Sequence, residues 1–131
     1  MDNNFEVRFN EFLTNIVLSG LEYVQNMAEE INIYLSWRER KVNCNVFFCN
    51  VFYRINGILI EKPNFDNALS EAQKKVFRYD LLKQRQEHLS DSVIENLTNA
   101  EKFCVENGHE MPKKIVINYL VSEKEIKTKY S

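Results

Sequence analysis

The stretch Arg54-Ile55-Asn56-Gly57-Ile58-Leu59-Ile60 decides the fold, because it predicts a tight β-hairpin near the middle of the chain. Asn-Gly readily adopts positive φ at both central positions of a type I′ turn, whose twist matches that of two antiparallel strands. The apolar residues on either side of the turn then belong to the two paired strands. We therefore expect an antiparallel sheet that includes this hairpin.

Two strands are predicted upstream of the turn, and the second of them is the first strand of the hairpin. Residues 42–55 are rich in β-branched and aromatic residues, and the apolar run at 46–49 is typical of a strand covered on both faces. Residues 31–37 alternate between apolar and polar side chains, the pattern of a half-buried strand. The charged segment at 38–41 is the predicted turn between them.

A long amphipathic helix is predicted before these strands, from a cap at residues 2–4 to about Ala28. One face of this helix is apolar and is expected to enter the core. Its residues are Phe5, Phe9, Phe12, Leu13, Ile16, Val17, Gly20, Val24 and Met27.

The second half of the chain predicts more helix and then a final hairpin. Ser70 or Asn67 is the expected cap of a helix that extends to about His88. Ser90 or Asp91 is the expected cap of a following helical stretch that stops at Asn107-Gly108, and a bend or break near Leu89 is left open. Alternating residues at 115–119 and 126–130 predict a closing hairpin.

These elements predict an α+β fold, with helices packed on an antiparallel sheet in the order α-β-β-β-α(-α)-β-β. A chain of 131 residues that is 44% hydrophobic suits one domain, residues 1–131. No apolar run is long enough to span a bilayer and no signal peptide is evident, so we expect a cytoplasmic protein without a membrane partner.

Charge is distributed unevenly along the chain. The net charge is -2, but residues 1–37 carry six acids against one base, whereas residues 38–88 carry ten bases against six acids. The chain as a whole should therefore not attract nucleic acid, and its acidic end should lie on the first helix.

Motifs for catalysis or cofactor binding are absent from the sequence. There is no phosphate-binding glycine loop, and no HExxH, CxxC or GxSxG. Cys44 and Cys49 should point to opposite faces of a strand, and Cys104 should lie on the apolar face of its helix, which suits buried thiols better than a zinc site. We therefore expect neither an enzyme nor a bound cofactor. An enzyme of unrecognised type is left open, and it would require a cleft with converging polar groups of perturbed pKa.

Two charged surfaces remain as candidate sites. Glu11, Glu22 and Glu29 fall within about 20° of one another on the predicted first helix, opposite its apolar face, with Leu18 among them and Glu30 just beyond. An apolar residue ringed by acids is typical of an interface anchor surrounded by steering charges. The alternative is an ordinary solvated helix face.

The other candidate is a basic and aromatic face at residues 74–88. Lys74, Arg78 and Arg85 are spaced four and seven residues apart, so on one continuous helix they would share a face suited to phosphates. Such a face would make the protein a small nucleic-acid-binding or protein-interaction module. Solvated charges that pair with neighbouring acids are the alternative.

The chain also resembles YezG-type immunity proteins of bacterial polymorphic toxin systems. The resemblance rests on the order of elements and on two stretches, Glu106-Asn107-Gly108-His109-Glu110-Met111-Pro112 leading into Ile115-Val116-Ile117-Asn118-Tyr119, and Glu125-Ile126-Lys127-Thr128-Lys129-Tyr130. It covers roughly residues 8–60 and 103–130. The tryptophan that usually follows the glycine turn in that family is absent here, and the basic region at 74–85 is not typical of it.

This resemblance implies an immunity protein that neutralises a cognate toxin by binding it, with a nuclease as the expected class of toxin. A nuclease cleft is basic, so an acidic helix face could bind it and speed association. The expected contact residues are Glu11, Leu18, Glu22 and Glu29, with Glu30 secondary. Edge strands could also pair between subunits, which leaves a homodimer open.

Overall fold

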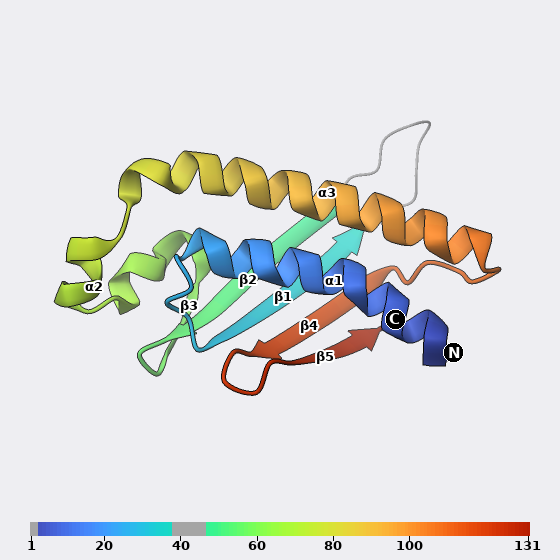
Figure 1. Ribbon diagram of the computed structural model, residues 1–131, viewed down its shortest axis with the longest axis horizontal. Helices are drawn as coiled ribbons and strands as arrows, with labels where there is room; N and C mark the ends of the chain where they lie inside the picture. The colour runs from blue at the N-terminus through green and yellow to red at the C-terminus, as the bar shows by residue number, and fades with distance from the viewer. Residues whose placement is uncertain (1–2, 38–46) are drawn as a thin grey trace.

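The computed structural model describes residues 3–37 and 47–131 and has an α+β fold, as the sequence predicts (Figure 1). Its elements in order are α1 (Asn3–Tyr23), β1 (Glu30–Trp37), β2 (Phe47–Ile55), β3 (Ile58–Glu61), the 3-10 helix η1 (Lys62–Ala68), α2 (Glu71–Val76), the 3-10 helix η2 (Tyr79–Leu81), α3 (Leu82–Glu106), β4 (Lys114–Leu120) and β5 (Glu125–Tyr130). The predicted turn at 38–41, the predicted cap at Asp2, and Cys44 lie outside the described residues.

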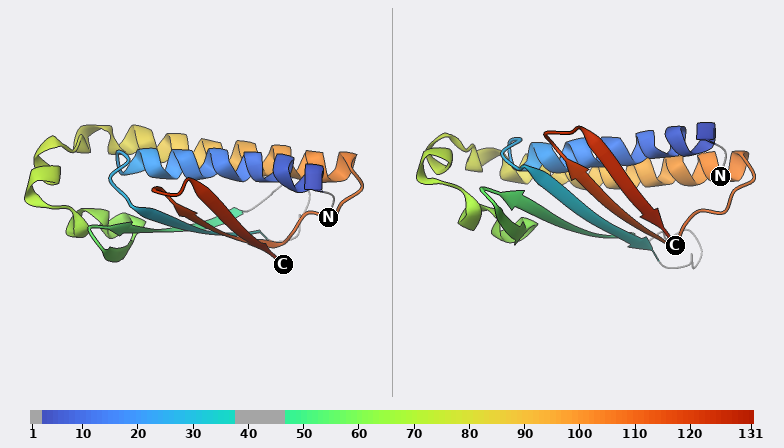
Figure 2. Two further views of the ribbon diagram at one scale, coloured as in Figure 1. Left: turned by 60° about the horizontal axis from the view of Figure 1, so that its bottom comes forward. Right: turned by 90° about the horizontal axis from the view of Figure 1, so that it is seen from below.

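The five strands form one antiparallel sheet in the order β3-β2-β1-β4-β5, which makes β1 the central strand. The helices α1 and α3 lie side by side across one face of this sheet (Figures 1 and 2). Among the described residues, no α-helix covers the opposite face (Figure 2). The molecule therefore has two layers.

The core lies between the helices and the sheet. Odd-numbered residues of β1, β2 and β4 point toward the helices, because side chains alternate between the faces of a strand. The buried residues from these strands are Ile31, Ile33, Leu35, Val51, Tyr53, Ile55, Ile115 and Ile117. The predicted apolar face of α1 packs against them, with Phe12 and Met27 only half-buried.

Both predicted hairpins form. Asn56 and Gly57 have φ of 52° and 77°, as a type I′ turn between β2 and β3 requires. The Asn56 side-chain amide also donates hydrogen bonds to the Ala68 carbonyl at 2.9 Å and to Gln73 Oε1 at 2.7 Å. This turn is therefore tied to η1 and α2.

The first helix is shorter than predicted. It ends at Tyr23 instead of near Ala28, because Gln25 and Asn26 adopt left-handed φ of 57° and 58° and turn the chain into β1. The apolar spacing at Val24 and Ala28 continues past the helix because both side chains still enter the core. Glu29 and Glu30 are therefore not on a helix.

The break between the later helices lies at residues 77–81. Ser70 caps α2 through a capping box with Gln73, as predicted for one of the two candidate caps. The chain then leaves the helix so that Phe77 can bury its ring against Phe65, at 5.0 Å between ring centroids. By contrast, α3 continues through Leu89, which is buried, so the predicted cap at Ser90 or Asp91 is wrong.

The apolar run before the hairpin does not form a strand covered on both faces. Only one face of β2 lies under the helices, and Phe48 on the other face is 48% exposed. For the part of the run at 48–49 that the structure describes, the expected burial on both faces is therefore wrong. Residues 42–46 of the predicted strand lie outside the described residues.

A close contact joins α1 to the centre of the sheet at Gly20. A Cβ atom at this position would lie 2.6 Å from Ile31 Cδ1, so a larger residue would force the fully buried Ile31 side chain to shift. The Tyr53 hydroxyl on β2 donates a 2.6 Å hydrogen bond to the Gly20 carbonyl. Both groups are buried, so this bond positions the C-terminal part of α1 over the sheet.

The variant Tyr53→Phe should lower the free energy of unfolding by about 1–3 kcal/mol, because it leaves the buried Gly20 carbonyl without its partner. Urea denaturation measures this change. The matched control is Tyr34→Phe, where the tyrosine is 45% exposed and the change should be close to zero. Equal stability of the two variants would contradict a structural role for the Tyr53 hydroxyl.

Candidate functional site

A groove runs between α1 and α3 on the helical face of the molecule, with a volume of about 360 Å³. The helices are joined beneath it by a 3.1 Å hydrogen bond from Asn15 Nδ2 to Asn96 Oδ1, and Asn96 also donates to the Ser92 carbonyl at 2.8 Å. Its lining residues are Asn15, Leu18, Ser19, Glu22, His88, Asp91, Ser92, Glu95 and Asn96. The floor is therefore polar and fixed.

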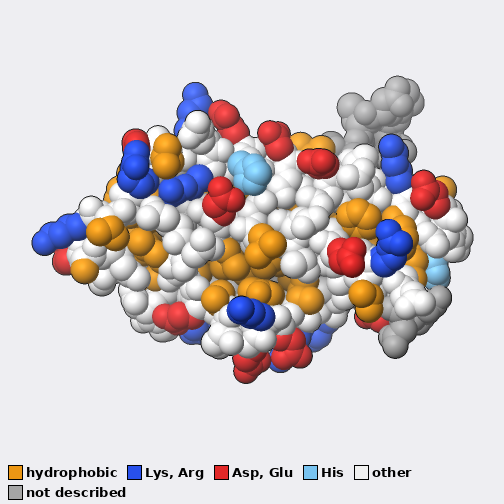
Figure 3. Space-filling view, in the orientation of Figure 1, with side chains coloured by type: hydrophobic (Ala, Val, Ile, Leu, Met, Phe, Trp, Pro, Cys, Tyr) orange, Lys and Arg blue, Asp and Glu red, His pale blue; other side chains and the backbone are white. Residues whose placement is uncertain are grey.

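Acidic side chains surround an exposed leucine in this groove. Leu18 is 53% exposed, as the sequence predicts, and Glu22 follows it one turn later on α1. Asp91 and Glu95 line the groove from α3. The residues that line the groove include no lysine or arginine. Figure 3 shows acidic side chains in a row along this side of the molecule. The groove thus offers an apolar anchor among three carboxylates.

Asp91 and Glu95 were not predicted from the sequence, although their spacing indicates that they share one face of a helix. Together with Glu87 they form a column at intervals of four residues on α3, and all three are exposed. Like charges at this spacing destabilise a helix by roughly 0.2–0.5 kcal/mol per pair. A column that costs stability is a reason to expect a partner of opposite charge.

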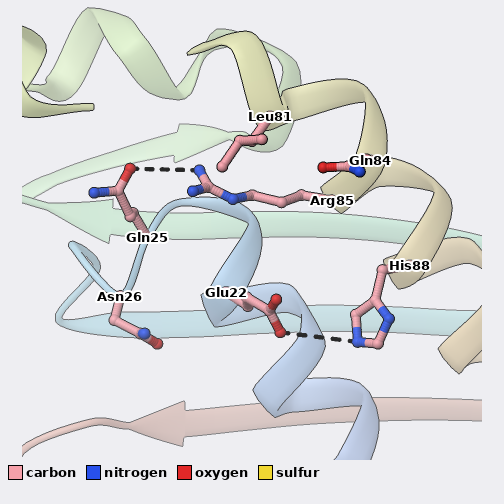
Figure 4. Close-up of a pocket in the computed structure, with 7 residues that line it drawn as sticks. All are labelled: Glu22, Gln25, Asn26, Leu81, Gln84, Arg85 and His88. Atoms are coloured by element: carbon pink, nitrogen blue, oxygen red, sulfur yellow. Dashed lines mark hydrogen bonds and ion pairs between the residues drawn. The ribbon is translucent and has the colours of Figure 1, made fainter. Parts of the chain in front are cut away.

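A second pocket adjoins the groove toward the end of α1 that leads to β1, and Figure 4 shows its residues. Glu22 Oε2 lies 3.8 Å from His88 Nε2, and the Arg85 guanidinium donates to Gln25 Oε1 at 3.4 Å. Glu22 therefore has a basic neighbour in His88, and Arg85 lines the same pocket. The acidic character is strongest toward Asp91 and Glu95, away from Arg85.

The other predicted contact residues lie outside the groove. Glu11 is exposed on α1 but does not line it. Glu29 follows the end of the helix, and its carboxylate accepts a 3.3 Å hydrogen bond from the Gly57 N–H at the hairpin. The residues predicted to share one face of a continuous helix therefore lie in separate parts of the molecule. Only Leu18 and Glu22 meet in the groove.

Glu30 belongs to a polar network on the opposite face of the sheet. Its carboxylate accepts hydrogen bonds from Arg54 Nε at 3.2 Å, Asn32 Nδ2 at 3.2 Å and Asn118 Nδ2 at 2.6 Å. Burial raises the pKa of this carboxyl, but the hydrogen bonds and the Arg54 charge lower it by more, so the pKa lies below its ordinary value. Glu30 is therefore best explained as a structural residue.

The predicted basic face does not exist as one helix face. Lys74 lies on α2, Arg78 lies between α2 and η2, and Arg85 lies on α3. Lys74 pairs with Glu71 at 3.7 Å, and Arg78 forms a two-bond ion pair with Asp80 at 2.8 and 3.0 Å. The Arg85 guanidinium lies 5.5 Å from the centroid of the Phe77 ring. These contacts match the alternative of solvated and paired charges.

The two described cysteines show no sign of activation. Burial raises the pKa of the Cys49 thiol to about 11, which the Lys62 ammonium only partly offsets. Cys104 is buried with its Sγ 3.8 Å from Met111 Sδ. Within residues 3–37 and 47–131, no three His, Cys, Asp or Glu side chains converge as a metal site, and no helix is long and apolar enough to cross a membrane.

No family model matches the chain, and no curated protein is significantly similar to it. The function is therefore inferred from the geometry and charge of the site, together with the resemblance described above.

The variant Glu30→Gln should remove a pH-dependent contribution to the free energy of unfolding. Because the folded-state pKa of Glu30 is lowered, its contribution is fully present above the unfolded-state pKa and is lost as the pH falls through the folded-state pKa. The difference in unfolding free energy between wild type and Glu30→Gln should therefore shrink below about pH 4.5. Urea denaturation across a pH series measures this.

The matched control for this pH series is Glu123→Gln in the turn between β4 and β5, where the carboxylate is exposed. Its curve should run parallel to that of the wild type. A Glu30→Gln curve that is also parallel would show that the network contributes no pH-dependent stability.

Proposed function

We propose that this protein is a cytoplasmic immunity protein that neutralises a cognate bacterial toxin by direct binding, and that the toxin is a nuclease. The acidic groove between α1 and α3 is the proposed binding surface, with Leu18 as its apolar anchor. In this proposal the protein is not an enzyme and needs no cofactor. Its task is to hold a stable surface that is complementary to the basic cleft of the toxin.

The observation that carries the proposal is the position of Leu18 among carboxylates from two helices. An exposed leucine can enter a pocket of a partner, while Glu22, Asp91 and Glu95 meet the basic side chains that a nuclease uses to hold phosphates. Hydrogen-bonded asparagines hold the two helices in register, so little ordering is needed on binding. The groove therefore has the charge and the fixed geometry that a basic partner requires before binding takes place.

The competing proposal, a binding module that uses the basic face at 74–88, has less support. The three basic residues lie on separate elements, and two of them already pair with acids. A partner that binds Lys74 and Arg78 would have to break the ion pairs of these residues with Glu71 and Asp80. We therefore place the binding site in the groove.

The double variant Asp91→Lys, Glu95→Lys should weaken toxin binding by roughly 100-fold or more. Close charge pairs across such interfaces contribute about 1.5 kcal/mol or more each, and the variant replaces two of them by repulsion. The binding partner for calorimetric titration is the C-terminal domain of the toxin, and it is to be identified by a search for a large toxin gene directly upstream of this gene. Both positions are exposed on α3, so the fold should be retained.

The matched control carries the same change in charge at Glu123→Lys, Glu125→Lys, in and after the turn between β4 and β5. This control should bind the toxin domain almost as tightly as the wild type. Wild-type affinity of the Asp91→Lys, Glu95→Lys variant would remove the groove from the proposal. Failure of the wild type itself to bind the toxin domain would count against immunity.

Association with the toxin domain should also depend on salt. Carboxylates that steer a basic partner raise the association rate, and salt screens this attraction over a Debye length of about 10 Å at 0.1 M. Stopped-flow measurements should show the wild-type rate falling as salt increases, with a much flatter dependence for Asp91→Lys, Glu95→Lys. The same steep dependence in both proteins would mean that other acids steer the encounter.

A further inference from the structure

The face of the sheet opposite the helices carries a regular array of side chains. Even-numbered residues of β1, β2 and β4 and odd-numbered residues of β5 point to this face, because directly opposed residues of antiparallel strands share a side. No α-helix of the described residues lies over it (Figure 2). This surface is separate from the acidic groove, which lies on the helical side.

Three aromatic rings lie on this face. Tyr34 on β1 is 45% exposed, Phe48 on β2 is 48% exposed, and Phe52 on β2 is half-buried. The rings of Tyr34 and Phe52 contact edge to face, with centroids 5.6 Å apart. This contact holds the two rings in place while part of each surface stays open to solvent.

Each aromatic ring lies in a cross-strand row that also holds a lysine. The register gives the rows Phe48–Ser36–Lys114, Asn50–Tyr34–Val116–Lys129 and Glu61–Phe52–Asn32–Asn118–Lys127. Neighbouring strands are about 4.8 Å apart, so the base of each lysine lies about 10–14 Å from its ring. Successive rows are about 6.7 Å apart along the strands. The three rings on β1 and β2 therefore form an aromatic column, and the three lysines on β4 and β5 form a lysine column beside it.

The three lysines are exposed, and no described carboxylate forms an ion pair with any of them. Between the columns, Asn118 Nδ2 donates to Glu30 and also to Asn32 Oδ1 at 2.8 Å. Arg54 neutralises Glu30 through their 3.2 Å contact. The centre of the face is thus a fixed, neutral polar surface, and the lysine column remains as unpaired positive charge.

We propose that this sheet face binds single-stranded nucleic acid, with bases stacked on Tyr34, Phe52 and Phe48 and with phosphates at Lys114, Lys127 and Lys129. Aromatic rings beside a line of cations are what a single strand requires, since every base has a face that stacks and every phosphate carries a charge. The carboxylates of the groove lie on the other side of the sheet. On this face Glu30 is paired with Arg54, while Glu61 and Glu125 lie on the two edge strands, β3 and β5, so the described strands present four bases against three acids here.

A second copy of the chain suits this face less well. Two sheets that pack face to face need apolar inner surfaces, but here Glu30, Asn32 and Asn118 occupy the centre and lysines occupy one side. Burial of that network and of the lysines away from water would cost free energy. A nucleic-acid interface is polar and hydrated, so it leaves these groups solvated.

The test is fluorescence anisotropy of labelled oligouridine and oligothymidine of about ten nucleotides, titrated with the full chain. Both should bind, and a blunt duplex of the same length should bind at least tenfold more weakly, because its bases are not free to stack. A difference between RNA and DNA strands would assign the 2′-hydroxyl a role. The three lysines predict a slope of log Kd against log salt of about 2.

Two sheet variants separate the two parts of the site. Tyr34→Leu keeps the side chain apolar but removes a stacking surface, and it should weaken binding about fivefold or more. Lys127→Gln, Lys129→Gln removes two phosphate contacts and should lower the salt slope by about 1.4. The matched controls on the helical side are Tyr79→Leu, at a tyrosine that is 42% exposed, and Lys83→Gln, Lys102→Gln on α3. Neither control should change binding.

Circular dichroism and thermal unfolding confirm that each variant is folded, so that a loss of binding is a loss of contact. Absence of binding at about 100 μM wild-type protein would overturn the proposal, because even weak electrostatic binding is seen in that range. Equal binding by wild type and both sheet variants would also overturn it. So would a wild-type dimer in sedimentation that Tyr34→Leu dissociates, since the face would then belong to a second copy.

Discussion

The approach of α1 to the sheet at Gly20 is the constraint on which the rest of the structure depends. The glycine lets the helix backbone come within contact of Ile31 on the central strand, and the Tyr53 hydroxyl fixes the helix there through the Gly20 carbonyl. On the same face of the sheet α3 packs beside α1, and Asn15 donates to Asn96 between the helices. The groove exists because of this arrangement.

The fold places two kinds of surface on opposite sides of the molecule. The helical side has carboxylates around Leu18, whereas the open sheet face combines aromatic rings with lysines. Strand alternation makes this separation possible, because each strand sends one set of side chains into the core and the other to solvent. The two proposed binding surfaces, which differ in charge, can then coexist on a chain of 131 residues whose net charge is only -2. Mutations on one face can be tested without altering the other.

The candidate site was only partly predictable from the sequence. Helical periodicity correctly placed Leu18 on the solvent side, because that position depends only on the local turn of the helix. The same periodicity wrongly extended the helix to Glu29, since it cannot detect that Gln25 and Asn26 take left-handed φ. Asp91 and Glu95 were missed because their relation to Leu18 crosses from one helix to another.

By itself, the sequence determined the local elements: the turn at Asn56-Gly57, the helix stop at Asn107-Gly108, the strand alternation and hence the α+β class. These follow from backbone preferences and side-chain periods that act over a few residues. Only the tertiary structure decided that one face of β2 stays open, that the helices break at 77–81, and that acids of α1 and α3 share a groove. Such features depend on contacts between residues far apart in the chain, which no local pattern records.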